Sequence, residues 1–322
     1  MTLPRRAAAL ALVAAVGAGC GLPPIGPSAP TPTPSTSPTA EATPTASASP
    51  GVASLDLTVP GAATALVAEL MAASGVSRAV MVTVTSDDAT VAVLRGGRPQ
   101  TWAWRDGRIQ EVPGDIAYVA QRTFDPSDFD FDDLGALFRV SEAVSGSRQD
   151  QSLQIVDYSG GLVSMSVSTN PESRAVFFTP DGRLLPTLDF TSAWGLEQGY
   201  ADAVGGRGTA SALGFGSALG VYLDTPQRAD GGIDRRQRTA RTPVLVTPRT
   251  EAAAPAPFDP ARVDPTVVWG VLTALQDEGR FTLDTAWSCV VDDRAGTGTP
   301  RMHFTVGDRS FVTDLAGTPV PG

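Results

Sequence analysis

The chain has 322 residues, a formal net charge of −10 and 24 basic residues, all of them arginine. Without lysine there is no Schiff-base nucleophile and no Walker A phosphate loop, and a single histidine, His303, excludes multi-histidine metal sites. The acidic excess argues against nucleic-acid binding, because phosphate contacts need clustered bases. We therefore expect no cofactor, no metal, no nucleic-acid partner and no enzymatic activity.

The first twenty residues have the features of an export signal. Two arginines give a charged start, and residues 7–16 form an apolar segment too short to span a bilayer. Residues 17–19 are small and precede Cys20. Residues 1–20 are therefore predicted to be a signal peptide.

Residues 17–20, Gly-Ala-Gly-Cys, resemble a bacterial lipobox, with Gly17 where that pattern usually has an aliphatic residue. The resemblance implies a diacylated Cys20 and a lipid anchor on the extracytoplasmic face of the cell membrane. The arginine- and alanine-rich, lysine-free composition is similar to that of secreted lipoproteins of the high-GC actinobacterial type. An ordinary secretory signal with a chance cysteine is the alternative.

Residues 21–51 hold nine prolines, eleven serines or threonines and one charge. Such a segment buries too little apolar surface to offset its ordering entropy, so it is predicted to be a disordered tether. If Cys20 is lipidated, Cys289 has no intrachain partner, and we expect no disulfide framework.

From residue 52 onward, one pattern recurs: a glycine-ended helix followed by short alternating strands. The predicted fold class is α+β, with tandem modules of a helix plus a three- or four-stranded antiparallel sheet. The motif Phe-Asp-Pro precedes two of the helices, which supports duplication. We expect neighbouring sheets to join or stack, because each unit's helix shields one sheet face. The predicted units span about 60–120, 124–190 and 258–322, with a degenerate unit at 191–250 that completes a repeat region over 52–251.

The degenerate unit is expected to have a helix at 192–204 and strands at 212–223 and 243–247. Residues 252–257 read as a linker into the last unit. The glycine-ended helices and the Asp-Gly turns at 106–107 and 181–182 resemble tandem modules such as PepSY-like domains and the beta-lactamase inhibitor protein. That resemblance implies binding to a partner and not catalysis.

Several patterns were weighed as sites of chemistry. The acidic run over 125–133 lacks the glycine and the final glutamate of an EF-hand, so helix capping is the better interpretation. Strand alternation predicts a solvent-facing His303 and a buried, inert Cys289. The run Gly214-x-Gly216-x-x-x-Gly220 misses the dinucleotide spacing by one residue.

The most unusual surface feature is a group of five arginines, predicted to lie in an exposed, mobile loop: Arg228, Arg235, Arg236, Arg238 and Arg241. A solvated loop is one interpretation, and a patch for an anionic partner such as lipid headgroups or wall polymers is the other.

Two functions follow from the sequence. The first is a membrane-anchored surface lipoprotein whose modules bind a protein or another envelope component. The second is a carrier of an apolar envelope ligand. A single large cavity favours the carrier, whereas separately packed module cores favour the interaction protein.

Overall fold

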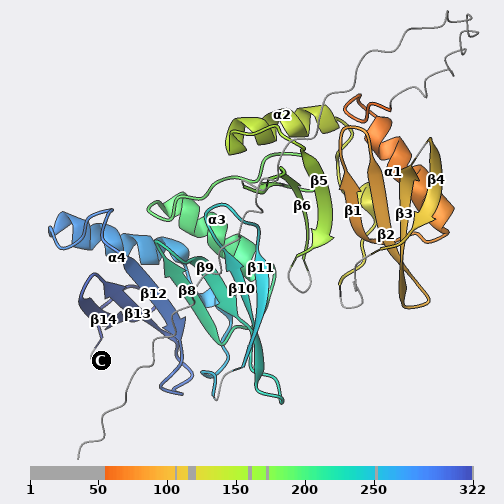
Figure 1. Cartoon of the computed structure of the whole chain (residues 1–322). Coiled ribbons are helices and arrows are strands. Elements are labelled where there is room, and N and C mark those ends of the chain that lie inside the picture. The colour runs from red at the N-terminus through yellow and green to blue at the C-terminus, as the bar shows by residue number, and fades with distance from the viewer. Residues whose placement is uncertain are drawn as a thin grey trace, which may run out of the picture. The chain divides into compact units, whose positions relative to one another are not determined.

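The computed structural model describes residues 55–105, 107–114, 121–158, 162–171, 174–250 and 253–320. Cys20, the predicted signal peptide and the predicted tether lie outside the described residues. Within the described part, the chain is an α+β protein with two seven-stranded antiparallel sheets, each carrying two helices (Figure 1).

The first module, residues 57–185, joins two of the predicted units into one sheet. Its strand order is β4-β3-β2-β1-β5-β6-β7, so the meanders of the two units meet at an antiparallel central pair, β1 and β5. Its elements are α1 (Ala62–Ser74), β1 (Ala79–Val84), β2 (Ala89–Arg95), β3 (Arg98–Arg105), β4 (Arg108–Val112), the 3-10 helix η1 (Pro126–Asp128), α2 (Leu134–Ser145), β5 (Ser152–Asp157), β6 (Val163–Ser168) and β7 (Val176–Phe178).

The second module, residues 188–320, repeats the same path. Its strand order is β11-β10-β9-β8-β12-β13-β14, with β8 and β12 as the central antiparallel pair. Its elements are α3 (Ala193–Val204), β8 (Ala212–Gly216), β9 (Gly220–Asp224), β10 (Gly232–Arg238), β11 (Leu245–Thr250), η2 (Pro260–Arg262), α4 (Pro265–Asp277), β12 (Trp287–Asp292), β13 (Arg301–Val306) and β14 (Arg309–Thr313).

The unit expected to be degenerate is complete, with a helix and four strands. The single strand predicted over 212–223 is a hairpin, β8 and β9, and the strand predicted at 243–247 is β11. Strand β10 was not predicted, because its sequence, Gly-Ile-Asp-Arg-Arg-Gln-Arg, lacks an apolar alternation.

Capping side chains fix where the helices begin. Asp133, Ser192 and Asp264 each accept a hydrogen bond from a backbone N–H in the first turn of α2, α3 and α4. The repeated Phe-Asp-Pro motif does the same work in both modules. Its aspartate caps η1 or η2. Its phenylalanine exchanges two backbone hydrogen bonds with the start of the module's first strand: Phe124 with Ala79, the first residue of β1, and Phe258 with Ala210, just before β8.

Each module has its own hydrophobic core between its two helices and one face of its sheet. Leu70 and Leu134 from the helices are fully buried in the first core, and Leu196 and Leu272 are fully buried in the second. Burial of each such side chain contributes roughly 1.5–3 kcal/mol. Both α-helices of a module cover the same face of its sheet, and no helix within the described ranges covers the opposite face.

No helix in the described ranges is both long and apolar enough to cross a bilayer.

Candidate functional site

The five arginines singled out in the sequence do not form a mobile loop. Arg235, Arg236 and Arg238 lie in strand β10, which pairs with β9 on one side and β11 on the other. Because strand side chains alternate, Arg235 points to the face without helices, whereas Arg236 and Arg238 point toward the helices. The prediction of an exposed, mobile loop is wrong.

Arg236 and Arg238 are buried and serve the fold. Arg238 is 1% exposed, and its Nε donates to Asp202 Oδ2 of α3 at 3.0 Å. The same guanidinium donates to the carbonyls of Thr239, Thr242 and Pro186. Arg236 Nε donates to the carbonyl of Ala203, at the end of α3. Both long side chains replace apolar ones at core-facing positions, which is why the sequence pattern looked like a loop.

The other two arginines flank the strand. Arg228 lies in the turn before β10 and donates to Asp234 Oδ2 at 2.8 Å. Arg241 is exposed beyond the end of β10. The five arginines are therefore spread over both faces and the edges of the sheet, and anion binding by all five as one patch stays a prediction.

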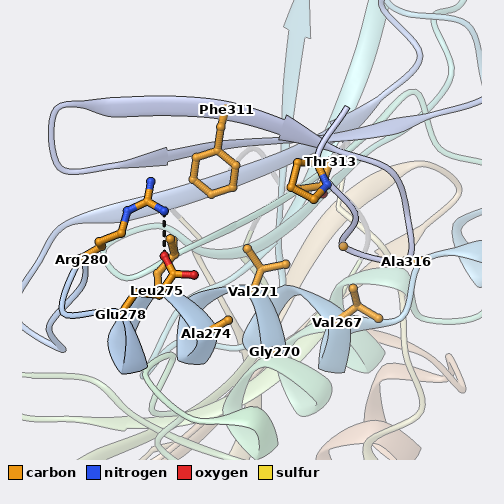
Figure 2. A pocket seen from close by; sticks show the side chains of 12 residues that line it. Val267, Gly270, Val271, Ala274, Leu275, Glu278, Arg280, Phe311, Thr313 and Ala316 are labelled. Atoms are coloured by element: carbon orange, nitrogen blue, oxygen red, sulfur yellow. Dashed lines mark hydrogen bonds and ion pairs between the residues drawn. The ribbon is translucent and has the colours of Figure 1, made fainter. Parts of the chain in front are cut away.

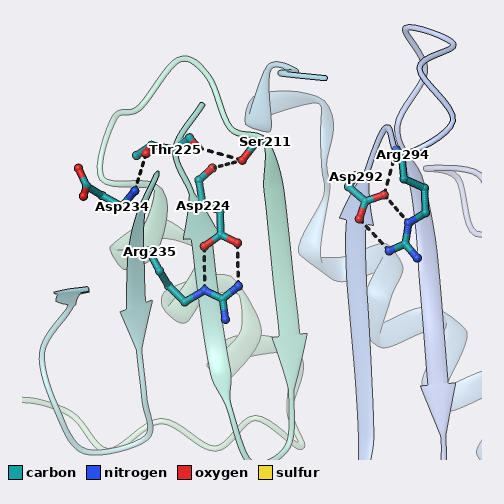
Figure 3. Close-up of polar contacts among 7 residues, drawn as sticks. All are labelled: Ser211, Asp224, Thr225, Asp234, Arg235, Asp292 and Arg294. Carbon is teal, nitrogen blue, oxygen red and sulfur yellow. Dashed lines mark hydrogen bonds and ion pairs between the residues drawn. The ribbon is translucent and has the colours of Figure 1, made fainter. Parts of the chain in front are cut away.

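Arg235 belongs to a tightly built cluster on the face opposite the helices (Figure 3). Its Nε and Nη2 donate to the two carboxylate oxygens of Asp224, each at 2.7 Å. The guanidinium also stacks on Tyr222, 3.7 Å from the ring centroid. Asp224 and Tyr222 are 5% and 8% exposed, so the pair and the ring are fixed before any ligand arrives.

A second pair repeats this arrangement across strand β8. Arg294 Nε and Nη2 donate to the carboxylate of Asp292 at 2.8 and 2.7 Å (Figure 3). His303 Nε2 lies 3.6 Å from the same carboxylate. Asp224 and Asp292 both stand opposite Ala212 in the register, so their backbones lie two strand spacings apart, about 10 Å.

We call this surface the arginine face and define it by Tyr222, Asp224, Arg235, Asp292, Arg294, Arg301 and His303. Arg301 joins it because it stands opposite Asp292 in the register of β12 and β13.

The glycine run in the sequence explains part of this surface. A Cβ on Gly214 would lie 1.9 Å from the Tyr222 ring, so the ring rests directly on β8. Gly220 has a φ of +74° at the start of β9, and a Cβ there would lie 2.2 Å from the carbonyl oxygen of Arg238. The run forms a tight antiparallel hairpin beneath the Tyr222 ring, whereas the dinucleotide fingerprint lies between a strand and a helix.

Burial and neighbouring charges set the electrostatics of the arginine face. Burial raises the pKa of Tyr222, which keeps its phenol neutral, and the hydrogen bond to Asp292 raises the pKa of Arg294. Burial, together with Arg294 and Arg301, lowers the pKa of His303. The surface presents two arginine–aspartate pairs, in which each guanidinium holds its carboxylate through Nε and Nη2, and one of these pairs lies over the buried ring of Tyr222.

The structure also shows where the other candidate residues from the sequence lie. In the acidic run, Asp125 and Asp133 cap η1 and α2, and Asp132 accepts a hydrogen bond from Thr64. Across the described ranges, no group of three or more histidine, cysteine or acidic residues is placed to hold a metal. Cys289 is fully buried in the second core, and this burial raises the pKa of its thiol well above the usual value, which confirms the prediction of a buried thiol.

No protein-family model matches the chain, and no curated protein matches it significantly in sequence.

Reading the sequence missed most of the arginine face. Tyr222, Asp292 and Arg294 were not singled out, because the residues of the face come from two units of the repeat and meet only when β8 lies between β9 and β12. The signal available was local: two strands, β9 and β12, each end in an aspartate.

Proposed function

We propose that the protein is a membrane-anchored lipoprotein whose folded part, on the extracytoplasmic face, binds a protein or another envelope component without catalysing a reaction. The arginine face is the observation that carries this proposal. The likeness of the modules to PepSY-like domains and the beta-lactamase inhibitor protein, noted from the sequence, agrees with a binding role.

The composition of the arginine face supports binding. Arginine and tyrosine are enriched at protein interfaces and dominate their binding energy. Arg235 and Tyr222 are held in one geometry by Asp224, so little side-chain freedom is lost when a partner docks. Two separately packed cores also favour an interaction protein over a carrier built around one cavity.

The proposal is tested by isolating the lipidated protein with its partners from native membranes. The double variant Arg294→Gln and Arg301→Gln removes two charges from the arginine face and keeps hydrogen-bonding side chains of similar length. Arg309→Gln is the matched control, because Arg309 is exposed and its position in β14 faces the other side of the sheet. We expect the double variant to lose the co-purified partner and the control to keep it.

Equal recovery of the same partner by both variants contradicts the assigned face. Thermal melting of each variant, compared with the unsubstituted protein, separates lost binding from lost folding.

Anchoring is tested apart from binding. We expect Cys20→Ala to release the protein from the membrane fraction, because diacylation of that thiol supplies the stable anchor. A Cys20→Ala protein that stays membrane-bound contradicts lipidation at this residue and leaves the binding proposal standing.

A carrier of an apolar envelope ligand is the second candidate function. A groove of about 620 Å³ beside α4, with mainly aliphatic and aromatic lining residues, favours it.

A further inference from the structure

The groove beside α4 is built from three parts of the second module (Figure 2). One wall is a stripe along α4, the other is Phe311 of β14, and Ala316, Gly317 and Pro319 line the part beside the N-terminal half of α4. Val267, Val271 and Leu275 point from the helix toward the strand that carries Phe311 (Figure 2). The stripe from residue 267 to residue 278 is about 16 Å long at 1.5 Å per residue.

Small residues keep the groove open. A Cβ on Gly270 would meet no atom within 4 Å, so this position of α4 faces open space. Gly317 has a φ of +84°, and a Cβ there would lie 3.1 and 3.2 Å from Val271 and Val267. The turn at Gly317 thus closes tightly over the helix at one end, while Gly270 leaves room in the middle.

The charged lining residues lie at the other end of the groove, where α4 ends. Among its lining residues, the two charged ones are Glu278 and Arg280, at the end of α4. The backbone fixes them: Gly279, at a φ of +68°, donates to the Gln276 carbonyl, and the N–H of Arg280 donates to the Leu275 carbonyl. This is a Schellman motif, which holds Arg280 at the mouth of the groove.

Arg280 can accept a further anion. Its Nη1 donates to Glu278 at 2.7 Å, and within the described part of the chain Nε and Nη2 make no hydrogen bond. Both partners of this ion pair are about half exposed, so the pair itself is weak and its charges are accessible to a ligand. A groove with an apolar stripe and a forked cation at one end matches an amphiphile with an anionic head.

The first module has no such cation at the equivalent place. Counted from the caps Asp133 and Asp264, Val140 and Val144 of α2 correspond to Val271 and Leu275, and both are more than one-third exposed. The residue that follows Gly146 there is Ser147, where the second module has Arg280. The apolar stripe is therefore common to both modules, and the cation is particular to the second.

We propose that the groove beside α4 binds a single acyl chain along Val267, Val271 and Leu275, with its anionic headgroup on Arg280. This assignment rests on the second candidate function, the carrier, and gives its ligand a site and a chemical class. Carboxylate and phosphate headgroups share the chemistry that a guanidinium recognises.

The test uses the full chain carrying Cys20→Ala, so that the protein's own acyl chains do not compete. A dansyl-labelled fatty acid is titrated by fluorescence and then displaced with an unlabelled fatty acid, a lysophosphatidic acid and a long-chain alcohol. The acid and phosphate arms distinguish the two headgroups, and the neutral alcohol measures the contribution of the charge.

We expect saturable binding of the labelled acid, with the alcohol at least about tenfold weaker than the better anion. Gly270→Leu should abolish binding, because it fills the groove at a position with open space and also removes a helix-destabilising glycine. Arg280→Gln should weaken the anions about tenfold and leave the alcohol unchanged. Ala201→Leu, which adds the same side chain at an exposed position of α3, should bind as the parent does.

The contrary outcomes distinguish a wrong ligand site from a wrong carrier function. Saturable binding that Gly270→Leu leaves unchanged overturns the groove assignment and keeps a carrier with another site. Equal affinity for the acid, the phosphate and the alcohol overturns the anionic head. Absence of saturable binding overturns both the groove and the carrier function.

Discussion

Replacing Arg238 with methionine should strongly destabilise the second module. The methionine keeps most of the apolar stem and removes the guanidinium, which donates to Asp202 Oδ2 at 3.0 Å and to three backbone carbonyls. The carbonyls of Thr239, Thr242 and Pro186 then lose this donor in a site where Arg238 was 1% exposed. A buried acceptor without a donor destabilises the folded state, because water does not reach it to replace the lost hydrogen bond.

The magnitude follows from the burial of the two partners. Breaking a fully buried ion pair by removing one partner costs about 3–5 kcal/mol. The side chain of Asp202 is 29% exposed, so water can solvate part of the carboxylate that remains. We therefore expect a loss near the lower end, about 3 kcal/mol in the free energy of unfolding.

The assay is urea unfolding followed by intrinsic fluorescence and circular dichroism. Arg241→Met is the matched control, because the same chemical change at this exposed position should alter stability by less than about 0.5 kcal/mol. A loss below about 1 kcal/mol for Arg238→Met would refute the reasoning, since it would mean that the guanidinium contributes no more than a surface charge.

Three further predictions concern single residues. Gly195→Ala should destabilise α3, because the new Cβ would lie 1.9 Å from the carbonyl oxygen of Asp189. Gly270→Ala should instead stabilise α4 by up to about 1 kcal/mol, because alanine favours the helix and its Cβ meets no atom there. Thermal melting of both variants checks this contrast. His303 has a lowered pKa in the fold, so the unfolded chain binds the proton first, and stability should fall as the pH drops through about 6.5. In melting curves taken across pH, His303→Gln should reduce this dependence of stability on pH. An unchanged pH dependence would mean that another titrating group causes it. Cys289 should react with a thiol reagent at the rate of global unfolding, and fast labelling of the native protein would contradict its burial.

Much of the fold could be predicted from the sequence, because local patterns decide it. Glycine-ended apolar stripes identified α1, α2 and α4, and the helix expected at 192–204 is α3. The Phe-Asp-Pro repeat pointed to duplication. What the sequence left open was how units pair, since joining through β1 and β5, or through β8 and β12, depends on contacts between distant residues.

The candidate site was harder to predict, because it is built from polar residues at strand positions. Arg236 and Arg238 occupy core-facing positions where alternation leads one to expect aliphatic side chains, so β10 resembled a loop. Their burial is possible because α3 supplies the carboxylate of Asp202 and the carbonyl of Ala203 as partners. Arg235 was singled out from the sequence, but its partners Asp224 and Tyr222 become neighbours through sheet register alone.

Site-specific photo-cross-linking tests the central claim that partners bind the arginine face. The chain has no lysine, so a photoreactive amino acid is placed at Thr305 or Thr247, both exposed on the face without helices. Glu197, exposed on α3, is the control position. Binding at this face predicts cross-linking of the same partner from Thr305 and Thr247 and none from Glu197, whereas a cross-link from Glu197 alone would contradict it.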